Sequence, residues 1–119
     1  MKEYNSWLKQ AEKDLDTAKY NIDGRKLEAG AFFLQQAVEK ALKALYIKKF
    51  ARLIKTHDLV LLARELKVPQ NLEEFCKKLT PAYQYTRYPD ITKEIDLENK
   101  INEFMEYSKE IIKWVKKNL

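Results

Sequence analysis

Glycine, proline and cysteine are scarce in this sequence, and each shortage removes a class of structure. Two glycines and three prolines in 119 residues leave few positions for tight turns, which favours long helices over many short strands. The single cysteine, Cys76, excludes a disulfide within the chain and a zinc cluster built on several cysteines. Since the chain also has only one histidine, we expect neither a conventional zinc site nor any other cofactor.

Long apolar runs are also missing. No stretch approaches the roughly 20 apolar residues that cross a bilayer, and the first residues lack the apolar segment of a signal peptide. We therefore expect no membrane association, and the lone cysteine fits a reducing, cytoplasmic location. A length of 119 residues predicts a single domain, residues 1–119, whose core needs no support from a disulfide or a metal.

Apolar residues recur at helical spacing along most of the chain. This pattern predicts an all-α fold, an up-and-down bundle of four to five helices. We expect helices over about 6–23 and 27–49, a short helix capped by Thr56 with Asp58 in its first turn, a helix capped by Asn71 that Pro81 breaks or kinks, and a last helix from about residue 95 to the end.

The second predicted helix carries a polar stripe opposite its apolar face, and large apolar residues bracket that stripe at both ends. A polar centre with an apolar border is typical of a subunit interface, so we expect a homodimer in which each patch meets its own copy. The alternative is a set of solvated charges above a buried helix. The predicted interface residues are Phe32, Phe33, Gln36, Glu39, Lys40, Lys43 and Ile47.

Positive charge is concentrated just after this stripe. The net charge of the chain is only +5, from 23 basic and 18 acidic residues. Lys48, Lys49, Arg52 and Lys55 nevertheless lie close together with no acidic residue among them. Such a cluster favours binding to the phosphates of RNA or nucleotides, although a solvated loop would have the same composition.

A second candidate binding segment combines aromatic rings with a cation. Tyr83, Tyr85 and Tyr88 interleave with Arg87, and such rings can stack on bases while an arginine binds phosphate. The structural alternative is an ion pair between Arg87 and Asp90, with the tyrosines packed over one end of the bundle.

Three short segments follow one another along the chain: QQAVEKALKAL at 35–45, KTHDL at 55–59 and RYPD at 87–90. In their wording and order they resemble the HEPN domain family of small prokaryotic helical proteins. The resemblance extends from about Trp7 to Trp114 and implies the helical bundle of that family. It also implies a functional partner, a minimal nucleotidyltransferase, in pairs where the HEPN protein can be the toxin and the partner the antitoxin.

Arg52 and His57 match the Arg-x4–6-His motif of ribonuclease members of the HEPN superfamily. In those members an arginine and a histidine from each subunit meet at the dimer interface. A histidine can move the proton of a ribose 2′-hydroxyl, and an arginine can hold the scissile phosphate, so no metal is needed. Ribonuclease members usually have a polar residue after the arginine, whereas this chain has Leu53. The structural alternative places His57 at the start of the third helix.

The leading hypothesis is therefore a homodimeric HEPN-type module associated with nucleotides or RNA and with a nucleotidyltransferase partner. One alternative is a metal-independent endoribonuclease that uses Arg52 and His57. The other is a domain that binds nucleotides without catalysis.

Overall fold

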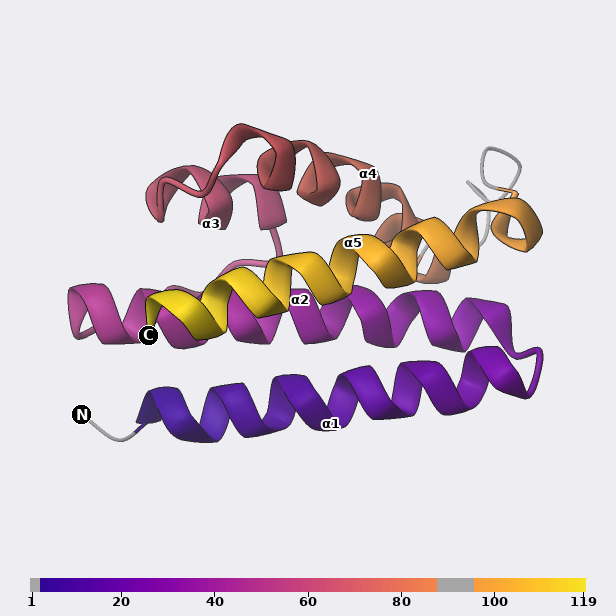
Figure 1. Ribbon diagram of the computed structural model, residues 1–119, viewed down its shortest axis with the longest axis horizontal. Coiled ribbons are helices and arrows are strands. Elements are labelled where there is room, and N and C mark those ends of the chain that lie inside the picture. The colour runs from indigo at the N-terminus through magenta and orange to yellow at the C-terminus, as the bar shows by residue number, and fades with distance from the viewer. Residues whose placement is uncertain (1–2, 88–95) are drawn as a thin grey trace.

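In the part of the chain that the structure describes, four long helices and one short helix follow one another in the order predicted from the sequence (Figure 1). The computed structural model describes residues 3–87 and 96–119, and of residues 81–87 only the backbone. The elements are α1 (Glu3–Asp23), α2 (Leu27–Phe50), α3 (Leu59–Glu65), α4 (Gln70–Arg87) and α5 (Leu97–Asn118). The long helices alternate in direction as an up-and-down bundle, so the predicted all-α fold is confirmed.

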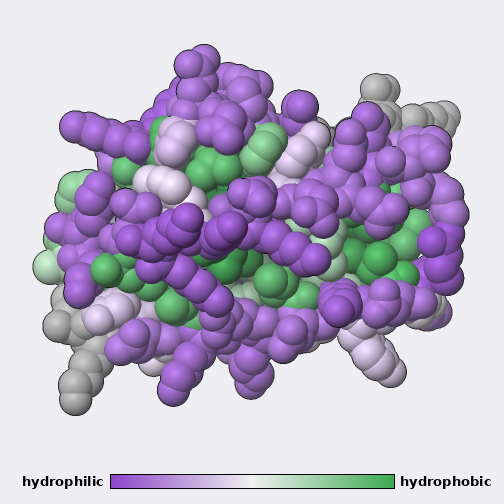
Figure 2. All heavy atoms as spheres, in the orientation of Figure 1, coloured by the Kyte–Doolittle hydropathy of each residue, from purple (hydrophilic) through white to green (hydrophobic). Residues whose placement is uncertain are grey.

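Helix α2 is the centre of this bundle, because α1, α3, α4 and α5 all pack against it. The predicted apolar face of α2 is buried completely or almost completely: Leu34, Ala37, Val38, Ala41 and Leu45. The predicted inner face of α5 is buried as well: Leu97, Ile101, Phe104, Ser108, Ile111 and Val115. Figure 2 shows that hydrophilic side chains dominate the face formed by α1 and α5, with hydrophobic side chains in a strip between them.

Gly30 lies where α1 packs closely against α2. A Cβ atom built at this glycine would lie 2.5 Å from Cγ1 of Ile22, so the Ile22 side chain would have to shift to admit any other residue. Glycine is a poor residue for a helix interior, but here it lets Ile22 of α1 pack directly on the backbone of α2. The turn between these helices takes only three residues, 24–26.

Two predicted caps of the later helices are wrong, and of the two outcomes predicted at Pro81 the break does not occur. Thr56 does not cap α3. Asp58 is the N-cap, since its Oδ1 accepts a hydrogen bond from the Leu61 amide at 3.0 Å, while Thr56 Oγ1 accepts one from the Asp58 amide at 3.1 Å. Asn71 lies inside α4, which begins at Gln70, and α4 continues past Pro81 to Arg87.

Candidate functional site

Glu39 is the centre of a polar cluster in the middle of α2. Its side chain is buried, with 3% of the residue exposed. Its Oε1 accepts hydrogen bonds from Gln35 Nε2 at 3.3 Å and from His57 Nδ1 at 3.0 Å. Its Oε2 pairs with the Lys43 ammonium at 3.0 Å. Both carboxylate oxygens are therefore satisfied by neighbouring side chains.

Local sequence explains how this cluster forms. Gln35, Glu39 and Lys43 are spaced four residues apart, so their side chains lie on one face of the helix. Helix α2 ends at Phe50 because Ala51 adopts a left-handed conformation, with φ of 54°. The chain then turns back, and the loop before α3 brings His57 alongside Glu39.

The structure brings His57 to α2 and leaves its ring accessible. The side chain is 57% exposed, although Nδ1 contacts the buried carboxylate. Capping of α3 belongs to the next residue, Asp58. An exposed imidazole whose Nδ1 is held by a carboxylate can serve as a binding or proton-transfer group.

Helix α1 supplies a second layer of contacts to the same face of α2. Lys40 Nζ lies 2.7 Å from Oδ2 of Asp14, which is itself buried. The Lys43 ammonium lies 5.6 Å from the centre of the Trp7 ring, within the range of a cation–π contact. These contacts hold the polar side chains of α2 against α1.

The predicted cationic cluster lies at the C-terminal end of α2 and in the loop that follows. Lys48, Lys49, Arg52 and Lys55 are all exposed, and among the described residues none of them forms an ion pair. Arg52 lies in the loop, as predicted, with its guanidinium 5.7 Å from the centre of the Tyr46 ring. We call these four side chains the cationic end.

Lys48 has an aromatic neighbour as well. Its ammonium lies 4.7 Å from the centre of the Tyr4 ring, which belongs to α1. Helix α1 thus places one aromatic ring beside Lys48 and another, Trp7, beside Lys43. A cation next to a partly exposed ring suits the phosphate and base of a nucleotide.

The seven predicted interface residues divide into two groups. Glu39, Lys43 and Ile47 are at most 6% exposed in the single chain. The other four keep accessible surface: Phe32, Phe33, Gln36 and Lys40. The first group is covered by other elements of the same chain, so it has little surface left for a second subunit. Most of the predicted interface must therefore come from Phe32, Phe33, Gln36 and Lys40.

The predicted tyrosine and arginine segment cannot be placed in the same detail. The side chains of Tyr83, Tyr85 and Arg87 lie outside the described residues, although the backbone of α4 is described through Arg87. Tyr88 lies outside the described residues entirely. The role predicted for this segment stays a prediction.

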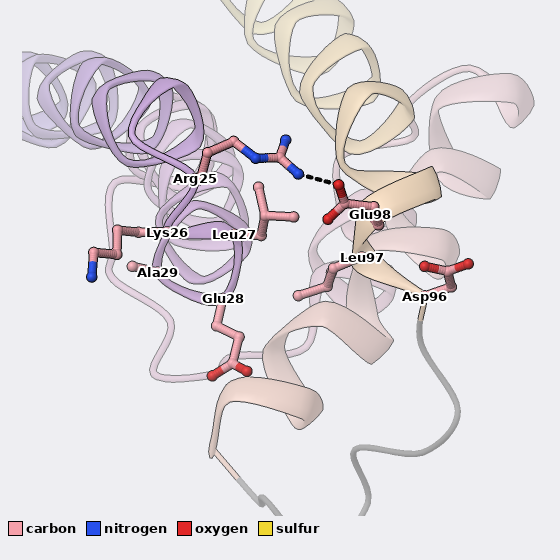
Figure 3. A pocket seen from close by; sticks show the side chains of 8 residues that line it. All are labelled: Arg25, Lys26, Leu27, Glu28, Ala29, Asp96, Leu97 and Glu98. Atoms are coloured by element: carbon pink, nitrogen blue, oxygen red, sulfur yellow. Dashed lines mark hydrogen bonds and ion pairs between the residues drawn. The ribbon is translucent and has the colours of Figure 1, made fainter.

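A hollow of about 610 Å³ lies away from this cluster, between the α1–α2 turn and the start of α5 (Figure 3). Arg25 and Glu98 form an ion pair across it, and both side chains are 63% exposed. The described residues that line the hollow are Arg25, Lys26, Leu27, Glu28, Ala29, Asp96, Leu97 and Glu98. None of them is a histidine or a cysteine.

The described part of the chain contains neither a membrane-spanning helix nor a group of metal-binding side chains. None of its helices combines the length and the apolar character that crossing a bilayer requires. Over residues 3–80 and 96–119, no three His, Cys, Asp or Glu side chains are grouped so that they could hold a metal ion.

Sequence reasoning missed the central role of Glu39 and the contribution of Trp7 and Tyr4. Gln35 and Glu39 stood in the matched segment, and their four-residue spacing with Lys43 was a readable signal of one polar face. No sequence signal linked Glu39 to His57, because that contact depends on the path of the loop.

Comparison with known proteins agrees with the helical fold. The family model of the HEPN domain matches residues 4–118. The crystal structure of TT1696 from Thermus thermophilus is 27% identical, with a TM-score of 0.90 over the full length of both chains. The crystal structure of ST0689, an archaeal HEPN homologue, is 30% identical with a TM-score of 0.79, over 98% of this chain and 97% of that one. No curated protein sequence matches the chain.

Proposed function

This chain belongs to the HEPN domain family, and we propose that it acts as a homodimeric module that binds the phosphates of RNA or nucleotides. The observation that carries the proposal is the cationic end, where Lys48, Lys49, Arg52 and Lys55 are exposed together. Unneutralised cations of this kind attract a phosphate backbone and release its counterions. Tyr4 and Trp7 stand beside the neighbouring lysines and offer ring surfaces to a base.

Measurement of RNA affinity against salt tests this proposal. We expect Lys48→Glu/Lys49→Glu to weaken binding of a single-stranded RNA by at least about tenfold at low salt. Loss of two phosphate contacts should also reduce the slope of log affinity against log salt by about 1.4, since each contact to a single strand contributes about 0.7.

A matched control separates a local site from net charge. Lys109→Glu/Lys113→Glu changes two exposed lysines of α5 instead, and both double variants lower the net charge from +5 by four, to +1. We expect the α5 variant to retain most of its affinity. Equal losses in the two variants would mean that RNA responds to overall charge, and the cationic end would not be the binding site.

The second candidate function is a metal-independent endoribonuclease. The specific observation in its favour is His57, whose exposed ring is anchored through Nδ1 to the buried Glu39 carboxylate. In this reaction His57 would take the proton of a 2′-hydroxyl while Arg52 holds the phosphate, and the product would end in a 2′,3′-cyclic phosphate.

Cleavage assays in chelator distinguish this enzyme from a binding module. If the chain is a ribonuclease, His57→Ala and Arg52→Ala abolish cleavage while the fold and the dimer persist. Arg64→Ala, which removes an exposed arginine from α3, serves as the control and should retain activity. If RNA stays intact after incubation with the wild-type protein, the ribonuclease hypothesis is wrong. The remaining hypotheses are then a binding module and a nucleotide-binding domain without catalysis.

The partner that we propose is a minimal nucleotidyltransferase, in a cytoplasmic pair of the toxin–antitoxin kind. Family resemblance supports this proposal. Co-expression of the chain with a nucleotidyltransferase encoded beside it should yield a complex that co-purifies, and growth arrest by the chain alone should be relieved by the partner. Absence of both effects would leave the chain without this role.

A further inference from the structure

The contact between Glu39 and His57 determines which ring nitrogen carries the proton. His57 Nδ1 lies 3.0 Å from Glu39 Oε1, within hydrogen-bonding distance. A carboxylate oxygen can only accept, so Nδ1 must donate, and the neutral ring then carries its proton on Nδ1 and its lone pair on Nε2.

We propose that Glu39 is a positioning residue that holds His57 in this tautomer and so makes Nε2 the nitrogen that accepts a hydrogen bond or a proton from a hydroxyl of the bound RNA or nucleotide. The identity of the ligand rests on the proposed function. The action of Glu39 on His57 rests on the contacts alone, so the two can be tested separately.

Glu39 is suited to this task because its own position is fixed. The carboxylate is buried on a long helix and receives Gln35 and Lys43 from one turn before and one turn after. The Lys43 ammonium is held in turn near the Trp7 ring of α1. His57 comes from an exposed loop, and its contact with this rigid carboxylate sets the orientation of the ring.

Because the chain contains a single histidine, ¹⁵N NMR of the imidazole reports His57 without ambiguity. For the neutral form of the ring, we expect the wild-type protein to show the Nδ1–H tautomer. Glu39→Gln should remove this preference, because an amide can present either an acceptor or a donor to Nδ1. Glu106→Gln, an exposed position on α5, is the matched control and should leave the spectrum unchanged.

Two results would overturn the proposal. One is a wild-type protein in which the Nε2–H tautomer predominates, a measurement that needs no variant. The other is an Nδ1–H tautomer that persists after Glu39→Gln. Since that substitution leaves the Lys43 charge buried without its partner and can unfold the protein, Glu39→Gln/Lys43→Met removes both charges and should give the same loss of tautomer preference.

A double-mutant cycle on RNA affinity tests the link to the ligand. We expect Glu39→Gln and His57→Ala each to weaken binding about threefold to tenfold, the size of one hydrogen bond. The double variant should be no weaker than His57→Ala, since Glu39 acts through His57. Additive losses would refute the positioning role. If the wild-type protein binds no RNA, the proposed function fails, and the tautomer measurement still decides what Glu39 does.

Discussion

Three polar side chains of α2 are buried in the most apolar part of the molecule. Burial of a charge costs several kcal/mol, and pairing rarely returns more than that cost. Gln35, Glu39 and Lys43 nevertheless lie at most 6% exposed. Among the described residues, every buried side-chain nitrogen and oxygen has a hydrogen-bond partner. We therefore expect this network to add little net stability, and we attribute its presence to the position that it gives to His57.

Cys76 is another buried group with a measurable consequence. It is completely buried, and burial raises the pKa of its thiol from 9.0 to about 12, with Glu73 adding to the rise. The unfolded chain therefore releases the thiol proton at lower pH than the folded chain does. Between those two pKa values the unfolded state binds fewer protons, so the free energy of unfolding must fall as pH rises.

We expect this fall to disappear when the thiol is removed. From about pH 8.5 to about pH 10 the wild-type protein should lose about 1 kcal/mol more of its free energy of unfolding than Cys76→Ala does, because one unit of pKa difference is worth about 1.4 kcal/mol. Urea unfolding at several pH values measures both proteins. The Ala variant is less stable at every pH through lost packing, so parallel curves would contradict the role of the thiol.

At the scale of elements, α3 is the shortest of the described helices, and its stability depends on the cap at its N-terminus. It spans only Leu59–Glu65, and so short a helix is not stable by itself. Its apolar side is anchored in the core through Leu59, Leu62 and Ala63. The Asp58 side chain satisfies one of the amides at its start.

We expect Asp58→Ala to lower the free energy of unfolding by about 1 kcal/mol, the usual value of an N-cap. Thr56→Ala is the matched variant, because Thr56 was the cap predicted from sequence and its hydroxyl contacts the Asp58 amide. It should cost about half as much or less. Chemical denaturation of the three proteins decides the matter, and a larger loss for Thr56→Ala would reverse the assignment of the cap.

The whole molecule shows which features a sequence of this kind can predict. Spacing of apolar residues predicted the buried faces of α2 and α5, because a helix of about 3.6 residues per turn relates sequence directly to a face. The same spacing could not predict that Glu39 and Lys43 are buried. Their depth depends on which other elements cover α2, and helical spacing within α2 carries no information about the path of the α2–α3 loop.

The assembly predicted from sequence gives a final test at this scale. Phe32 and Phe33 contact each other edge to face, with ring centres 5.3 Å apart, and Phe33 also packs against the core. Phe32 keeps accessible surface beside Gln36 on the same helix. A two-fold axis through this region would let each patch bury the same patch of a second copy.

We therefore expect Phe32→Glu to convert a dimer into a monomer at micromolar concentration, because it places like charges opposite each other in an apolar contact. Tyr20→Glu is the control, since Tyr20 is 80% exposed on α1 and should leave the dimer intact. Light scattering of the three proteins measures the outcome. A wild-type monomer, unchanged by salt, would refute the dimer.

If the chain also cleaves RNA at a site built from both subunits, Phe32→Glu should lose cleavage in parallel with dimerisation, while each chain keeps its fold and its Glu39–His57 contact.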